Sequence, residues 1–166
     1  MSRVDFYHLQ NQTLENVLPK LLEKAYETGK KVKIKVGNEE RVEFINTFLW
    51  TFNDQSFIPH GSRKDGFGEM QPIWLSAGDD NPNGSTMLFL VDGAKIDLDG
   101  LKQYERVFNI FDGNSETAVN AARTFWKELK GAGEEIYYWQ QEDNGRWKQK
   151  AWATGENISA ILIKIS

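Results

Sequence analysis

The segment KVKIKVGNEERVEFINTFL, residues 31–49, contains a strand pattern followed directly by a helix pattern. Valine and isoleucine alternate with lysine over residues 31–36, and successive side chains of a strand point to opposite faces of a sheet. This alternation predicts a half-buried strand near a sheet edge, with Val32, Ile34 and Val36 on the buried face. Asn38 is expected to cap the helix that follows. The apolar stripe of that helix is formed by Val42, Ile45 and Leu49, with Phe44 and Phe48 beside it.

The same alternation of strand and helix extends in both directions from this segment. Residues 4–9 predict a strand, and the spacing of apolar residues after Thr13 predicts a helix that ends at Gly29. Toward the C-terminus we expect strands, then a helix, then a hairpin. The strands are at 71–76, 86–93 and 104–111, the helix runs from about 115 to 131, and the hairpin joins 135–141 to 146–152. This order predicts an α/β fold with a mostly parallel central sheet and a C-terminal hairpin.

The length and composition are those of one folded domain without disulfides. The chain has 166 residues, a formal net charge of -4 and no cysteine. A chain of this length can bury a core without covalent cross-links, and the lack of cysteine excludes thiol chemistry. We expect one α/β domain over residues 1–150 and a C-terminal extension over 151–166 that adds a strand to it. The absence of a signal-peptide pattern or a long apolar run predicts a cytoplasmic protein.

Motifs that would indicate catalysis are missing. The sequence has no glycine-rich dinucleotide or P-loop motif, no nucleophile elbow and no zinc-protease motif. Residues 79–84 match the first half of a calcium-binding loop, but Leu90 stands where the loop needs a bidentate glutamate. His8 and His60 are far apart in sequence and lie beside no obvious nucleophile. We therefore expect no catalytic residue, no metal site and no cofactor.

The helix expected at residues 115–131 carries a basic stripe on an acidic protein. At about 100° per residue, one side combines apolar and basic residues. These residues are Val119, Arg123, Trp126, Lys127 and Lys130. The adjacent side, with Ala118, Ala122, Phe125 and Leu129, is expected to pack on the sheet. The basic stripe is either an ordinary solvated face or a docking surface for an acidic peptide that ends in an aromatic residue.

A second candidate surface lies in FLWTFNDQSFIPHG, residues 48–61, where large apolar residues crowd a helix end and the following loop. Some of them must belong to the core, and Phe48 and Leu49 fit that role. The others are either core residues or an exposed patch that binds a protein partner. The residues of this second candidate surface are Trp50, Phe57, Ile58 and Pro59.

Seven segments of the chain resemble the chi subunit family of bacterial DNA polymerase III. They occur in order over roughly residues 4–150, and the most specific is LWTFNDQSFIPHG at 49–61. The other six are FYHL, LLEKAYETGKKV, QPIWL, LFLVDG, ERVFNIFDG and AARTFWKELKGAG. The resemblance implies a Rossmann-like three-layer fold and a non-catalytic accessory subunit of the replicative holoenzyme, acting in DNA replication.

The resemblance also implies which partners the two surfaces bind. In that family the chi subunit links the clamp loader to single-stranded-DNA-binding protein by holding its acidic C-terminal tail, which ends in Pro-Phe. By position, Arg123, Trp126 and Lys127 match the tail-binding helix, and Lys130 extends its positive field. Trp126 and Val119 would wall a pocket for the terminal phenylalanine. Trp50, Phe57, Ile58 and Pro59 match the surface for a psi subunit or another clamp-loader or helicase partner, so DNA would be contacted only indirectly.

Two other functions are consistent with the sequence pattern. One is an α/β enzyme or binder that acts on a small nucleotide-like ligand, because the ends of parallel strands commonly form such sites. The other is a direct single-stranded DNA binder, although the acidic net charge argues against it. Its stacking platforms would be Trp74, Trp126, Trp139 and Trp147.

Overall fold

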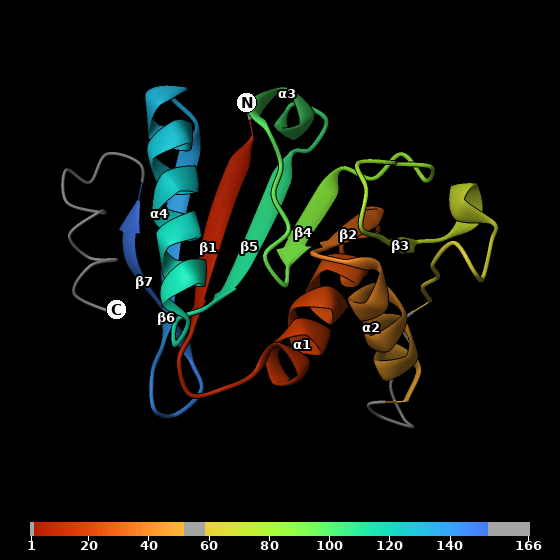
Figure 1. The fold of residues 1–166 in the computed structure, drawn as a ribbon, viewed down its shortest axis with the longest axis horizontal. Helices are drawn as coiled ribbons and strands as arrows, with labels where there is room; N and C mark the ends of the chain where they lie inside the picture. The colour runs from red at the N-terminus through yellow and green to blue at the C-terminus, as the bar shows by residue number, and fades with distance from the viewer. Residues whose placement is uncertain (1, 52–58, 153–166) are drawn as a thin grey trace.

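The computed structural model describes residues 2–51 and 59–152, which form a seven-stranded sheet with helices on both faces (Figure 1). The strand order is β3-β2-β4-β5-β1-β6-β7. All neighbouring strands are parallel except β6 and β7, which form the antiparallel C-terminal hairpin. The strands are β1 Arg3–Leu9, β2 Val32–Val36, β3 Ile73–Ser76, β4 Met87–Val91, β5 Arg106–Asp112, β6 Glu135–Gln141 and β7 Trp147–Trp152.

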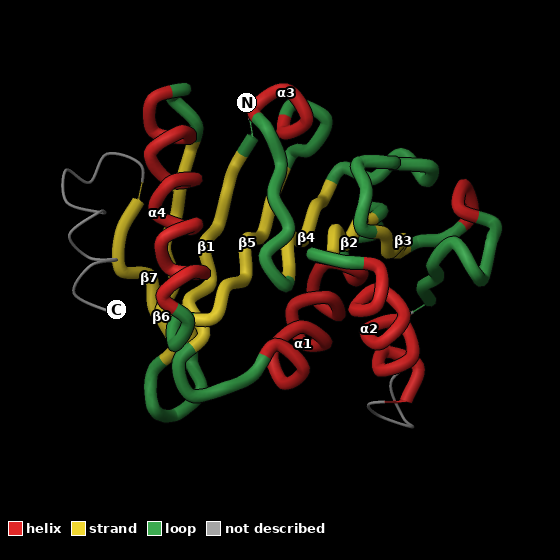
Figure 2. Tube along the Cα trace, viewed as in Figure 1, coloured by secondary structure: helices red, strands yellow, loops and turns green. Residues whose placement is uncertain are grey.

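The helices form two outer layers, which makes the fold a three-layer α/β structure (Figure 2). The longer ones are α1 Leu14–Glu27, α2 Glu39–Thr51 and α4 Glu116–Gly131; α3 Leu98–Leu101 and the 3-10 turn η1 Gly68–Met70 are short. One core cluster joins α1 and α2 to the sheet, and a second joins α3 and α4 to the opposite face. No helix within the described ranges is long and apolar enough to cross a membrane.

The predicted fold class is confirmed, and one strand differs in its burial. The strand at residues 31–36 was expected to be half-buried and near an edge; β2 does lie beside the edge strand β3, but it pairs with β3 and β4 and is buried on both faces. Lys33 is fully buried there, and its ammonium donates to Ser76 Oγ, to the carbonyl of Gly78 at 3.1 Å and to Asp80. These acceptors replace the water that burial removes, so a strand with alternating lysines can lie inside the sheet.

Ser115 caps the start of helix α4, and its hydroxyl accepts a hydrogen bond from the Ala118 N–H. All four residues expected to pack on the sheet contact the core beneath α4: Ala122 and Leu129 are fully buried, and Ala118 and Phe125 are partly buried. The difference is that Val119 and Trp126, expected on the accessible side, are fully buried as well. The helix thereby places the large indole against the sheet, which buries more apolar area.

The C-terminal extension stays a prediction. Strand β7 ends at Trp152, and residues 153–166, where a further strand was expected, lie outside the described residues.

Candidate functional site

The three basic residues of the stripe lie on the accessible side of α4. Lys127 and Lys130 are exposed, and Arg123 is half-exposed. The Arg123 Nη1 atom donates to Asn120 Oδ1 at 2.9 Å, one turn earlier in the helix. The structure therefore groups three cationic side chains within two turns of one helix, on a chain whose net charge is -4. Such a local positive field attracts an acidic partner.

The two apolar members of the stripe belong to the core. Val119 is 1% exposed and Trp126 is 2% exposed. The Trp126 ring packs against Phe6 of β1, with centroids 5.0 Å apart, and against Tyr138 of β6 at 6.3 Å. The expectation that Val119 and Trp126 line an open pocket is not met in this conformation, because neither side chain offers surface to a ligand.

The indole N–H of Trp126 is buried and has no hydrogen-bond partner within residues 2–51 and 59–152. A donor left in this state lowers stability compared with a ring that has no N–H. Packing of the ring must therefore offset that cost, which is consistent with Trp126 acting mainly as a core residue.

The second candidate surface is only partly described. Trp50 lies in the last turn of α2 and is 46% exposed. Its ring is tilted over the buried His60 ring with centroids 4.1 Å apart. Pro59 is half-buried next to that histidine. Phe57 and Ile58 lie outside the described residues, so only Trp50 and Pro59 can be placed on this surface.

Both histidines are held by the fold. His8 is fully buried, and its Nδ1 atom lies 2.7 Å from the Tyr138 hydroxyl. Burial lowers the pKa of His8 to about 4. The Nε2 atom of His60 lies 2.9 Å from the Asn46 carbonyl oxygen, which requires Nε2 to carry the hydrogen and donate it. A general base needs an accessible lone pair near substrate, and neither environment provides one.

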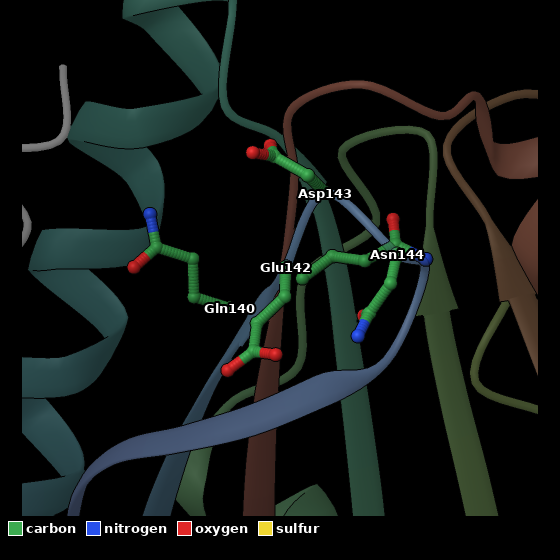
Figure 3. A pocket seen from close by; sticks show the side chains of 5 residues that line it. Gln140, Glu142, Asp143 and Asn144 are labelled. Carbon is green, nitrogen blue, oxygen red and sulfur yellow. The ribbon is translucent and has the colours of Figure 1, made fainter.

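Two hollows on the described surface give little support to a nucleotide-like ligand. The larger, about 490 Å³, lies at the β6–β7 turn and is lined by polar residues that include Glu142 and Asp143 (Figure 3). These carboxylates would repel the phosphates of a nucleotide. A smaller hollow of about 80 Å³ near the start of α2 is lined by Glu39, Glu43, Asp80 and Arg63 among others. The described part of the chain contains no group of three or more His, Cys, Asp or Glu residues that could hold a metal ion.

The four tryptophans considered for DNA stacking do not form one platform. Trp74 and Trp126 are buried, and they lie on β3 and α4. Trp139 and Trp147 are half-buried and share Tyr7 as a neighbour, at centroid distances of 6.2 and 5.0 Å. Because a stacking platform needs several exposed ring faces along one groove, this arrangement argues against direct DNA binding.

One feature of the surface was missed in the sequence. Phe67 and Met70 are the most exposed of the large apolar side chains that the structure describes, at 76% and 77%. They lie in a glycine-rich segment that predicts a loop, and a loop pattern by itself does not show which side chains point outward.

Comparison with known proteins assigns the chain to a family. The family model described as DNA polymerase III chi subunit, HolC, matches residues 1–137. The probable DNA polymerase III subunit chi of Rickettsia prowazekii (strain Madrid E) is 29% identical over 154 residues, which cover 91% of this chain and 93% of the relative. The residues matched by the family model include all of α4 and the segment 48–61, so they include both candidate surfaces.

Proposed function

Because this chain belongs to the DNA polymerase III chi subunit family, we propose that it is a non-catalytic adaptor that captures the acidic C-terminal tail of single-stranded-DNA-binding protein on helix α4. Membership of this family identifies the chain as an accessory subunit of the polymerase III complex. The proposal of tail capture depends on one observation, which is the accessible cluster of Arg123, Lys127 and Lys130 on a protein of net charge -4.

Each cation has a distinct role in the proposed contact. The planar guanidinium of Arg123 can hold a carboxylate with two parallel hydrogen bonds, whereas the lysines act as mobile point charges. Asn120, which accepts a hydrogen bond from Arg123, keeps that guanidinium on the helix surface. Lys127 and Lys130 then extend the positive field along the helix, where further acidic residues of the tail would lie.

The buried indole changes the proposed role of Trp126. We infer that Val119 and Trp126 support the helix from beneath, and that the terminal aromatic residue of the tail rests on the aliphatic stems of Arg123 and Lys127. Long basic side chains cover apolar surface in this way while their charged ends stay in water. Several tails on one DNA-bound protein would raise the effective concentration without new contacts.

Titration calorimetry with an acidic peptide that ends in Pro-Phe tests the proposal. Arg123→Ala should weaken binding by about 1–3 kcal/mol because a carboxylate then loses its charged partner. Higher salt should weaken the wild-type complex as well. Lys24→Ala, which removes an exposed lysine from the last turn of α1, is the matched control and should leave the affinity unchanged. Equal affinities of wild type and Arg123→Ala would contradict the assignment.

We propose a second, separate contact for Trp50 and Pro59, with a psi subunit or another clamp-loader or helicase partner. An exposed tryptophan at a helix end is the kind of side chain that dominates protein interfaces. Trp50→Ala should weaken binding to the polymerase III assembly by about 2 kcal/mol or more. Surface plasmon resonance with that assembly measures the effect, and tail-peptide binding should not change. Wild-type affinity in Trp50→Ala would exclude Trp50 from the contact.

A further inference from the structure

The chain contains the dipeptide Asn-Gly at residues 83–84 and again at residues 144–145. Both copies lie in tight turns, with the asparagine third of four residues and the glycine fourth. The glycine has a positive φ in each turn, 64° at Gly84 and 85° at Gly145. Its N–H donates to the carbonyl three residues earlier, at 3.2 Å in the first turn and 2.9 Å in the second. The two asparagines thus share a backbone setting and differ in their surroundings.

The first asparagine, Asn83, is held inside the protein between β3 and β4. It is 4% exposed. Its amide nitrogen donates to the carbonyls of Gln71 at 2.8 Å and Val32 at 3.4 Å, and its amide oxygen accepts from the Ser85 hydroxyl. A rotation of this side chain toward the next backbone nitrogen would break these hydrogen bonds and leave buried polar groups unpaired, which is costly. Asn83 is therefore fixed in a structural role.

The second asparagine, Asn144, lies in the turn between β6 and β7, where every residue from 142 to 146 is exposed (Figure 3). Its amide oxygen accepts from the Arg146 N–H at 2.9 Å. Its amide nitrogen donates to no residue that the structure describes, so the side chain is anchored at one atom. An exposed turn with few contacts opens locally at a low cost in free energy. The Asn144 side chain can therefore reach conformations that Asn83 cannot.

An accessible asparagine before a glycine can form a ring with its own backbone. The Gly145 nitrogen attacks the side-chain carbonyl carbon of Asn144, a carbon–nitrogen bond forms, and the amide nitrogen leaves as ammonia with the proton that Gly145 loses. Glycine has no side chain to obstruct this approach. The Arg146 N–H that donates to the attacked carbonyl stabilises the charge that develops on its oxygen. Solvent water then opens the succinimide ring at either carbonyl, which gives aspartate or isoaspartate.

We propose that Asn144 is a site of spontaneous deamidation and that Asn83, in the same dipeptide, is protected. The modification goes beyond the proposed function and does not depend on which partner the chain binds. Both products add one negative charge to a turn that already carries the exposed carboxylates of Glu142 and Asp143. The isoaspartate product also lengthens the main chain of the turn by one methylene.

The longer turn should loosen the C-terminal hairpin, because the length of a turn sets the register of the strands that it joins. Two contacts of the hairpin depend on this register. The Gln141 Nε2 atom donates to the Gly145 carbonyl at 3.0 Å, and the Trp147 ring packs against Tyr7 with centroids 5.0 Å apart. Isoaspartate at position 144 should therefore lower the melting temperature of the chain.

The test follows both asparagines by peptide mapping with mass spectrometry while the purified chain is incubated in mildly alkaline buffer, which favours loss of the proton from the attacking nitrogen. In the folded chain Asn144 should deamidate about tenfold faster than Asn83 or more, because a buried site opens at a higher cost in free energy. In urea the two rates should be similar, since only the fold distinguishes the sites. Asn144→Gln is the control and should not form this product, because its ring would need six members.

A second measurement separates the added charge from the longer backbone. The isoaspartate form, isolated by ion exchange from incubated protein, should melt at a lower temperature than fresh protein. Asn144→Asp adds the charge alone and should melt close to wild type. Three outcomes would overturn the proposal: equal rates at the two asparagines in the folded chain, no reaction of Asn144 in the folded chain while the urea-unfolded chain reacts, or aspartate without isoaspartate, which would show direct hydrolysis. An isoaspartate form that melts like fresh protein would overturn the predicted effect on the hairpin.

Discussion

Trp126 and Trp50 lie on helices that pack on opposite faces of the sheet, and their surroundings differ. Trp126, in the middle of α4, is enclosed by Phe6 and Tyr138 and is 2% exposed. Trp50, in the last turn of α2, contacts the His60 ring and is 46% exposed. The indole in mid-helix therefore serves the core, and the indole at the helix end keeps nearly half of its surface in solvent. The two residues are of the same type, so their difference in exposure comes from where each lies relative to the sheet.

A buried histidine lies near each tryptophan. His8 is hydrogen-bonded to Tyr138, whose ring contacts Trp126, so the histidine belongs to the core beneath α4. His60 is also buried, but it carries the exposed Trp50 on its ring. The difference between the two regions can be tested by measuring the free energy of unfolding, first after removal of each indole and then after protonation of His8.

The largest expected effect is on stability after truncation of the two tryptophans. Trp126→Ala should lower the free energy of unfolding by about 3–5 kcal/mol because it leaves a large cavity between α4 and the sheet. Trp50→Ala should lower it by about 1 kcal/mol or less, as for most surface substitutions. Urea unfolding followed by circular dichroism measures both values.

Trp126→Phe provides the control for this pair. It keeps an aromatic ring in the core and removes an indole N–H that has no partner within the described residues, so it should cost about 1.5 kcal/mol or less. Similar losses of unfolding free energy in Trp126→Ala and Trp50→Ala would contradict the assignment of Trp126 to the core and of Trp50 to the surface.

A smaller effect is expected from acidification. Burial lowers the pKa of His8 to about 4 from its usual 6.5, so the unfolded chain binds the proton more readily than the folded one. The contribution of neutral His8 to the free energy of unfolding is therefore fully present above pH 6.5 and is lost as the pH drops toward 4. Between pH 7 and pH 5 the loss should be about 2 kcal/mol. Urea unfolding at several pH values measures this slope.

His8→Asn is the matched variant for the pH experiment. It should be less stable than wild type at pH 7, because the packing with Phe111 is lost, but its stability should change little between pH 7 and 5. Asp80, whose pKa is lowered to about 2, titrates below this range and does not contribute to the slope. An unchanged slope in His8→Asn would show that another group controls the response to acid.

Most of the fold could be predicted from local patterns. The alternation over residues 31–36 and the apolar spacing over 39–51 predict β2 and α2, and each has a direct physical cause in side-chain geometry. The position of β2 inside the sheet could not be predicted in the same way. It depends on Ser76, Gly78 and Asp80, which are distant in sequence and supply the acceptors for buried Lys33.

The candidate site was predicted in part. The basic residues Arg123, Lys127 and Lys130 follow from helical spacing and are accessible. The roles of Val119 and Trp126 as an exposed pocket wall were not supported, because helical spacing gives the order of residues around the axis and leaves open which side faces the sheet. The exposure of Phe67 and Met70 had no signal in the sequence beyond a glycine-rich loop.

The sequence by itself determined the order of strands and helices, the helix that carries the basic stripe, and the resemblance to the chi subunit family. Each depends on residue spacing or on residues in fixed order along the chain. Only the tertiary structure decided that Trp126 is buried, that Lys33 lies inside the sheet and that Phe67 and Met70 are exposed. These depend on which distant segments meet, because burial is a property of the surrounding residues and of the area they remove from water.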